Sequence, residues 1–180
     1  MKDENKIQLG FGYIPVPQYI FVGGKDAQTE GPEYLWYSID FKTNKPLPIF
    51  DQALTGYITG IRMINKPYKG DDAVKVDISI QADRKYVVRS GIETIFTRGL
   101  LLALEIFDNL KDIPVTICVT PGDEKNVIYA SVYDAVNGEV VKFDWDKSKK
   151  LSPVVVGIQK QLGQEVQDIK KVLEEGRDKK

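Results

Sequence analysis

Histidine is absent from the 180-residue chain, and Cys118 is its single cysteine. Without histidine the chain cannot contain a Ser-His-Asp triad, a Cys-His pair or an imidazole metal site. A single cysteine forms neither an intrachain disulfide nor a thiolate zinc site, and with no histidine to activate it we expect an inert, buried thiol. We therefore expect a protein that is not an enzyme and that needs no cofactor or metal.

Long apolar runs and a strong net charge are also absent. No run approaches the roughly 20 residues of a membrane-spanning helix, and the polar start at residues 1–6 precedes no apolar signal segment. We expect a soluble, cytoplasmic protein without a membrane partner. The 25 Lys and Arg residues nearly balance the 26 Asp and Glu residues, which excludes a strongly basic nucleic-acid coat.

Composition divides the chain into three parts. Residues 1–55 carry a charge of −2 and are rich in glycine, proline and aromatic residues, which predicts an N-terminal arm that packs on the main body or forms a binding surface. Residues 56–145, also at −2, contain the strand patterns, and residues 146–180, at +3, begin with a basic run.

From Pro153 onward an amphipathic helix is predicted, with apolar residues at helical spacing: Leu162, Val166, Ile169 and Leu173. This helix docks either on its own domain or on a second subunit, and we expect a homo-oligomer.

The middle part combines strand and helix patterns. Val74, Val76, Ile78 and Ile80 alternate with polar residues, as in a half-buried strand. The sequence predicts strands over 56–64, 74–81, 85–91, 115–120 and 127–134, a helix over 93–110, and a hairpin turn at 137–138 that leads to a strand over 140–143.

Three strands, a helix and two strands is the element order of the OB-fold, a five-stranded Greek-key barrel. In this respect residues 56–143 resemble the OB-fold single-stranded DNA-binding proteins of bacteria, phages and plasmids, although no diagnostic motif is present and the tail at 178–180 is not acidic. The resemblance implies a mainly β fold, an OB-like β-barrel with one helix between its third and fourth strands, followed by the C-terminal helix. It also implies single-stranded DNA as the partner, with RNA left open. A small β-sandwich or an irregular antiparallel sheet with one helix is the competing architecture.

Binding of single strands requires cations for the phosphates and exposed aromatic faces for the bases. Tyr129 and Tyr133 share the polar face of one predicted strand, where they either stack on bases or are covered by another element. For Trp36 in the arm, packing against the main body is favoured over ligand binding. The candidate Lys and Arg side chains are also consistent with ordinary solvated charges. The candidate nucleic-acid-binding residues are Arg62, Tyr68, Lys75, Tyr86, Arg89, Tyr129, Tyr133 and Trp36. Acidic residues surround the same strands (Asp71, Asp72, Asp77 and Asp83), so we expect moderate, salt-sensitive binding.

Three functions are consistent with these patterns. The first is a sequence-tolerant single-stranded DNA-binding protein that uses aromatic stacking and Lys/Arg phosphate contacts. The second is a structural or protein–protein adaptor that oligomerises through the aromatic arm and the C-terminal helix. The third is a small-ligand-binding β-domain in which Trp36, Tyr34 and Tyr37 stack on a ring. A basic surface beside exposed aromatic side chains favours the first, and a closed aromatic pocket favours the third.

Overall fold

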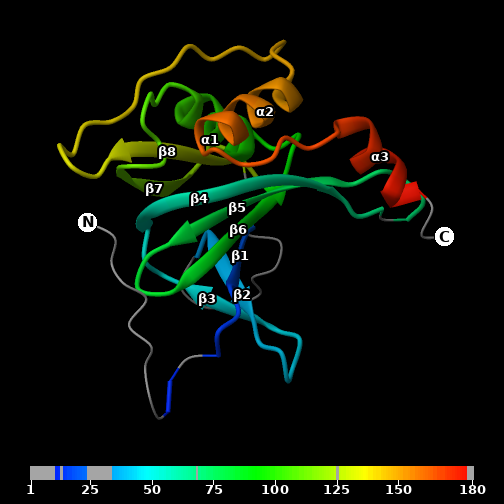
Figure 1. Ribbon diagram of the computed structural model, residues 1–180. Helices are drawn as coiled ribbons and strands as arrows, with labels where there is room; N and C mark the ends of the chain where they lie inside the picture. Colours follow the sequence, from blue (N-terminus) through cyan, green and yellow to red (C-terminus); the bar gives the residue numbers. More distant parts are fainter. Residues whose placement is uncertain (1–10, 13, 24–33, 68, 125, 178–180) are drawn as a thin grey trace.

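The structure, a computed structural model, describes residues 11–12, 14–23, 34–67, 69–124 and 126–177. Within these ranges the chain forms one curled, half-open sheet of eight strands in the order β3-β2-β1-β6-β5-β4-β7-β8, together with three helices (Figure 1). The mainly β fold and the C-terminal helix are thereby confirmed. The elements are β1 (Gln18–Val22), β2 (Trp36–Ile39), β3 (Pro46–Ile49), β4 (Ala53–Asn65), β5 (Val74–Gln81), β6 (Lys85–Gly91), α1 (Ile95–Glu105), β7 (Pro114–Pro121), β8 (Ile128–Asp134), α2 (Leu151–Gln161) and α3 (Ile169–Arg177).

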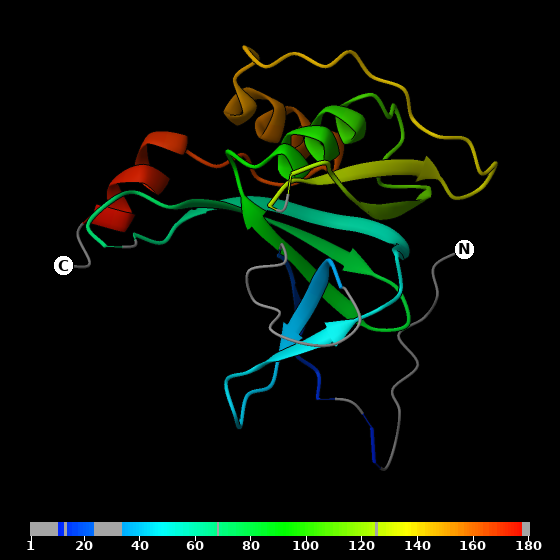
Figure 2. The same ribbon diagram turned by 180° about the vertical axis from the view of Figure 1, so that it is seen from behind.

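The core lies between one face of the sheet and the helices α1 and α2, which sit on the same side (Figures 1 and 2). Alternation along β5 sends Val76, Ile78 and Ile80 into this core, each at most 2% exposed. Leu100 of α1 and Ile158 of α2 are fully buried there. We call this side of the sheet the inner face, and the side without α1 and α2 the outer face.

Strands β4 to β7 form a Greek key. Hairpins join β4, β5 and β6, and β7 returns after α1 to lie beside β4. The long strand β4 pairs with β7 through residues 53–57 and with β5 through 57–65, with an irregularity between Ile58 and Gly60 that bends the strand. Gly56 lies at this crossover, where a Cβ atom would come within 2.6 Å of the Gln81 carbonyl oxygen.

The N-terminal arm continues the sheet through its own strands. β1 pairs in parallel with β6, and β2 and β3 follow as antiparallel neighbours. The prolines at 15 and 17 predict that a strand close to them is an edge strand or part of an extended arm. β1 instead starts at Gln18, after both prolines, and is an interior strand. The two prolines of β3 do lie in an edge strand, where a missing N–H costs no ladder bond.

The C-terminal part differs from its prediction in two places. A single helix was expected from Pro153 onward, whereas the structure has α2 and α3, separated because Gly163 adopts a left-handed φ of 66° just after α2. Both helices contact β4, so they dock on their own domain. The strand predicted over 140–143 is reduced to one bridge, between Tyr133 and Val140. None of the helices in the described ranges has the length and apolar character needed to cross a membrane.

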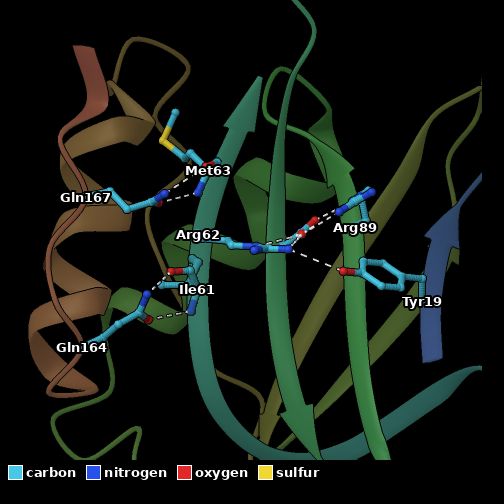
Figure 3. Close-up of polar contacts among 8 residues, drawn as sticks. Tyr19, Ile61, Arg62, Met63, Arg89, Gln164 and Gln167 are labelled. Carbon is cyan, nitrogen blue, oxygen red and sulfur yellow. Dashed lines mark hydrogen bonds and ion pairs between the residues drawn. The ribbon is translucent and has the colours of Figure 1, made fainter. Parts of the chain in front are cut away.

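Glutamine side chains cover the edge of β4 that extends beyond its pairing with β7 (Figure 3). The Gln164 amide accepts from the Ile61 N–H at 2.9 Å and donates to the Ile61 carbonyl at 2.8 Å. Gln167 makes the same two bonds to Met63, at 2.7 and 3.1 Å. Each amide thus replaces one residue of a neighbouring strand, and the edge is closed to pairing with another chain.

Removing both amides tests this edge. We expect Gln164→Ala combined with Gln167→Ala to lower the free energy of unfolding by about 1–3 kcal/mol for each site, because partly buried N–H and C=O groups lose their partners. Urea unfolding measures the change, and Glu165→Ala, an exposed position in the same segment, serves as the control. A double variant as stable as the control would contradict this role.

Candidate functional site

The outer face carries a row of side chains across five strands. In the register, Asp77 on β5 lies between Arg62 on β4 and Arg89 on β6, and Phe21 on β1 is next to Arg89. Tyr37 on β2 follows Phe21. Because register partners in a sheet project to the same side, these five side chains share the outer face.

Asp77 is the centre of this row. Its side chain is 1% exposed and accepts hydrogen bonds from Arg62 (Nε 3.2 Å, Nη2 3.1 Å) and from Arg89 (Nε 2.7 Å, Nη2 2.8 Å) (Figure 3). Hydrogen bonding to the Asp77 carboxylate raises the pKa of Arg89, against the opposing effect of burial. Two guanidinium groups share one carboxylate, so the cluster keeps one unbalanced positive charge. The sequence suggested Asp77 as an acid opposing an anionic ligand; the structure places it beneath the arginines as their counterion.

The two arginines differ in what they leave accessible. The Arg89 side chain is 13% exposed, and its guanidinium carbon lies 4.6 Å from the ring centre of Tyr19, so it is held between Asp77 and that ring. The Arg62 side chain is 54% exposed, and its Nη2 also donates to the Tyr19 hydroxyl at 3.5 Å. Among the described residues Arg62 Nη1 has no hydrogen-bond partner. Arg62 is therefore the group that can reach a phosphate, and Arg89 supports the surface beside it.

Aromatic rings continue the row beyond the arginines, and we call Tyr19, Phe21, Tyr37, Tyr34 and Phe50 the aromatic ladder. Ring centres are 6.5 Å apart for Tyr19–Phe21 and 5.6 Å for Phe21–Tyr37, with interplanar angles of 26° and 24°. Tyr34 meets Tyr37 and Phe50 edge to face. Burial, with a smaller effect of Tyr34, raises the pKa of Tyr37. Tyr19 and Phe21 were absent from the sequence-based candidates, although their alternation with buried Ile20 was the available signal.

A second group of tyrosines lies on the outer face of β8 and β4. Tyr133 pairs with Thr116 on β7, and the Thr116 hydroxyl is 2.7 Å from that of Thr55 on β4, which places these side chains on one side. Because alternate residues of a strand project to the same face, Tyr129 lies on the same side as Tyr133, and Tyr57 on the same side as Thr55. Tyr57 and Tyr129 are each 46% exposed, so their rings are open to a ligand.

The remaining predicted residues divide between the two faces. Lys75 lies on the outer face, in register with Gly91. Trp36 points inward: it is 2% exposed, and its indole N–H donates to the Asp51 carbonyl at 2.5 Å. Tyr86 is opposite Ile80 on the inner side, with its hydroxyl donating to Asp83 at 2.9 Å. Tyr68 lies outside the described residues. The outer face thus brings together Arg62, Lys75, Arg89, Tyr129 and Tyr133, and leaves out Trp36 and Tyr86.

A cavity of about 330 Å³ lies on the inner side near β1, β2 and the start of β4. Ile20, Trp36, Ile49, Leu54 and Tyr86 are among its lining residues. The lining is largely apolar, as in sites for small molecules. The cavity and the outer face are therefore two separate candidate sites.

Cys118 and the arrangement of the acidic side chains decide what metal or nucleophilic chemistry the described residues offer. Cys118 lies half-buried on β7, and burial raises the pKa of its thiol, which lowers the thiolate fraction at neutral pH. In the part of the chain that the structure describes, no group of three or more His, Cys, Asp or Glu side chains is placed to hold a metal ion.

Comparison with known proteins yields no relative for this chain. No family model, no curated protein and no solved structure matches it.

Proposed function

We propose that the chain is a sequence-tolerant single-stranded DNA-binding protein and that the outer face is its binding surface. The observation that carries the proposal is the cluster of Arg62, Asp77 and Arg89 directly beside the ring of Tyr19. Surfaces that bind single strands combine cations, which follow the phosphates, with aromatic rings on which bases stack. Both kinds of group meet here on rigid strands. In this role the protein performs no catalysis and needs no cofactor.

The strand order supports an OB-like unit within the sheet. Strands β4 to β8 lie in the order β6-β5-β4-β7-β8, with α1 between β6 and β7 in sequence. We propose that they form an OB-like barrel that is open between β6 and β8, because β1 occupies the edge of β6. OB-folds bind oligonucleotides on the face of their second and third strands, which correspond here to β5 and β6. Asp77 and Arg89 lie on those two strands.

The charge of the surface fits a ligand held by few phosphate contacts. Lys75 and Lys85 share the outer face with the arginine cluster. The acid closest to the arginines is Asp77, whose charge they neutralise. Each phosphate contact to a single strand adds about 0.7 to the slope of log affinity against log salt. We expect moderate affinity that falls with ionic strength, for DNA and to a similar degree for RNA.

The cavity beside Trp36 supports a second candidate, a small-ligand-binding β-domain. A planar apolar molecule of modest size fits its lining of Trp36, Ile49 and Leu54. The adaptor hypothesis has less support, because the arm strands belong to the sheet and α2 and α3 contact β4 of their own chain. We retain self-association as a proposal, which light scattering tests.

The proposal is tested by titrating a fluorescein-labelled oligo(dT) with the protein at low salt and following anisotropy. We expect binding that weakens as KCl is added, with a duplex of equal length bound more weakly. Tyr129→Ala combined with Tyr133→Ala should reduce the affinity while the circular dichroism spectrum is unchanged. Absence of binding to single strands at low salt would overturn the proposal.

A further inference from the structure

The aromatic ladder lies on β1, on β2 and the segment just before it, and on the segment after β3, outside the five strands of the proposed OB-like unit. We infer that this ladder is an additional subsite that takes unpaired nucleobases next to the phosphate bound at Arg62. The inference rests on the proposed function and extends it to the N-terminal strands, which the OB-like unit does not require.

The aromatic ladder is continuous with the arginine cluster. Tyr19 contacts both arginines, through its ring to Arg89 and through its hydroxyl to Arg62. From Tyr19 the ring planes of Phe21 and Tyr37 follow within 26° of the preceding ring. A strand whose phosphate binds Arg62 therefore has aromatic rings directly beside it.

The chemistry of the ladder favours nucleobases over other occupants. β1 and β2 contain no acidic residue, and the adjoining cluster has one unbalanced positive charge, so the strands that carry Tyr19, Phe21 and Tyr37 add no negative charge that would repel a polyanion. Every base presents a flat π-face that stacks on an aromatic ring, and these faces are free in a single strand but covered in a duplex. Pairing of β1 with β6 and β2 fixes the backbone beneath the rings, so the protein loses little conformational entropy when a ligand binds there.

The length of the oligonucleotide distinguishes binding at this subsite from binding at the arginine cluster. The path from Arg62 on β4 to Tyr37 on β2 crosses four strand spacings, or about 19 Å at about 4.8 Å each. A short oligonucleotide held at Arg62 does not reach the end of the ladder, whereas a longer one does. The contribution of the ladder should therefore grow with ligand length.

The experiment compares Phe21→Ala combined with Tyr37→Ala against the control Phe41→Ala, a ring that is 87% exposed in the turn after β2 and lies off the ladder. Oligo(dT) of about 4 and about 16 nucleotides, the limits of OB-fold site sizes, are the ligands. We expect the ladder variant to lose about 5- to 150-fold in affinity for the longer oligonucleotide, the equivalent of stacking one base at about 1–3 kcal/mol. The loss for the shorter one should be smaller, the salt slope unchanged, and Phe41→Ala without effect.

A second variant keeps the test independent of folding defects. Phe21→Trp retains a ring, and its added fluorescence should be quenched by the longer oligonucleotide and shielded from acrylamide. If wild type binds single strands but the ladder variant binds as tightly and the new tryptophan is not quenched, the inference is wrong and the proposed function stands. Equal losses in the ladder variant and Phe41→Ala also overturn it. If wild type binds no single strand, and the ladder variant instead changes the oligomeric state, both proposals fail and the ladder is a protein interface.

Discussion

Replacement of Asp77 by alanine is expected to lower the free energy of unfolding by about 3–5 kcal/mol, the usual cost of removing one partner of a buried ion pair. The Asp77 side chain is 1% exposed and that of Arg89 13%, so the variant leaves a largely buried guanidinium without its counterion. Arg62, at 54% exposed, turns to water and contributes less to the loss. Denaturant unfolding monitored by circular dichroism measures the change.

Two variants control this experiment. Asp123→Ala removes an exposed acid and should change stability by no more than about 0.5 kcal/mol. Asp77→Asn keeps the shape and one acceptor but loses the charge, so its stability should fall between wild type and Asp77→Ala. An Asp77→Ala protein as stable as the Asp123→Ala control would show that the arginines do not depend on Asp77.

Replacement of Arg62 by alanine is expected to weaken single-strand binding about 10- to 150-fold, which corresponds to one charge-assisted hydrogen-bonded contact of about 1.5–3 kcal/mol. The loss should be similar for all base sequences, because a phosphate contact carries no sequence information. The slope of log affinity against log salt should decrease in magnitude by about 0.7. Stability should change little, since the side chain is half exposed.

Lysine at the same position separates charge from geometry. Arg62→Lys retains the positive charge, so we expect the wild-type salt slope with a smaller loss of affinity, because the fork of donors is gone. Lys111→Ala removes an exposed charge in the loop after α1 and serves as the charge-matched control. If Arg62→Ala and Lys111→Ala have the same effect on affinity and slope, the outer face is not the binding surface.

Local patterns predicted the parts of the fold that depend on local contacts. The alternation over 74–81 places Asp77 opposite the Val/Ile row, as β5 shows. Folding this strand back on 85–91 about residue 83 already pairs Asp77 with Arg89, so half of the cluster was accessible from sequence. Its role as counterion depends on the register that places it between Arg62 and Arg89, which the order of acidic residues along the chain does not indicate.

The parts of the fold and of the outer face that local patterns did not predict depend on contacts between distant segments of the chain. Parallel pairing of β1 with β6 joins residues almost 70 positions apart, and no local pattern marks it. Without that pairing Tyr19 and Phe21 belong to a proline-rich arm and not to the outer face. The apolar spacing of 162, 166, 169 and 173 continued across Gly163, whose positive φ ends α2. Likewise, the amides of Gln164 and Gln167 find their partners on β4 only in the folded chain.

The most direct test of the outer face as a single-strand binding surface is a heteronuclear NMR titration with unlabelled oligo(dT). We expect the side-chain Nε–H resonance of Arg62 and the backbone amides of β1, β5 and β6 to shift progressively with added ligand, while those of α2 remain in place. Shifts confined to the basic segment 147–150 and α2, or no shifts at low salt, would contradict the proposed surface.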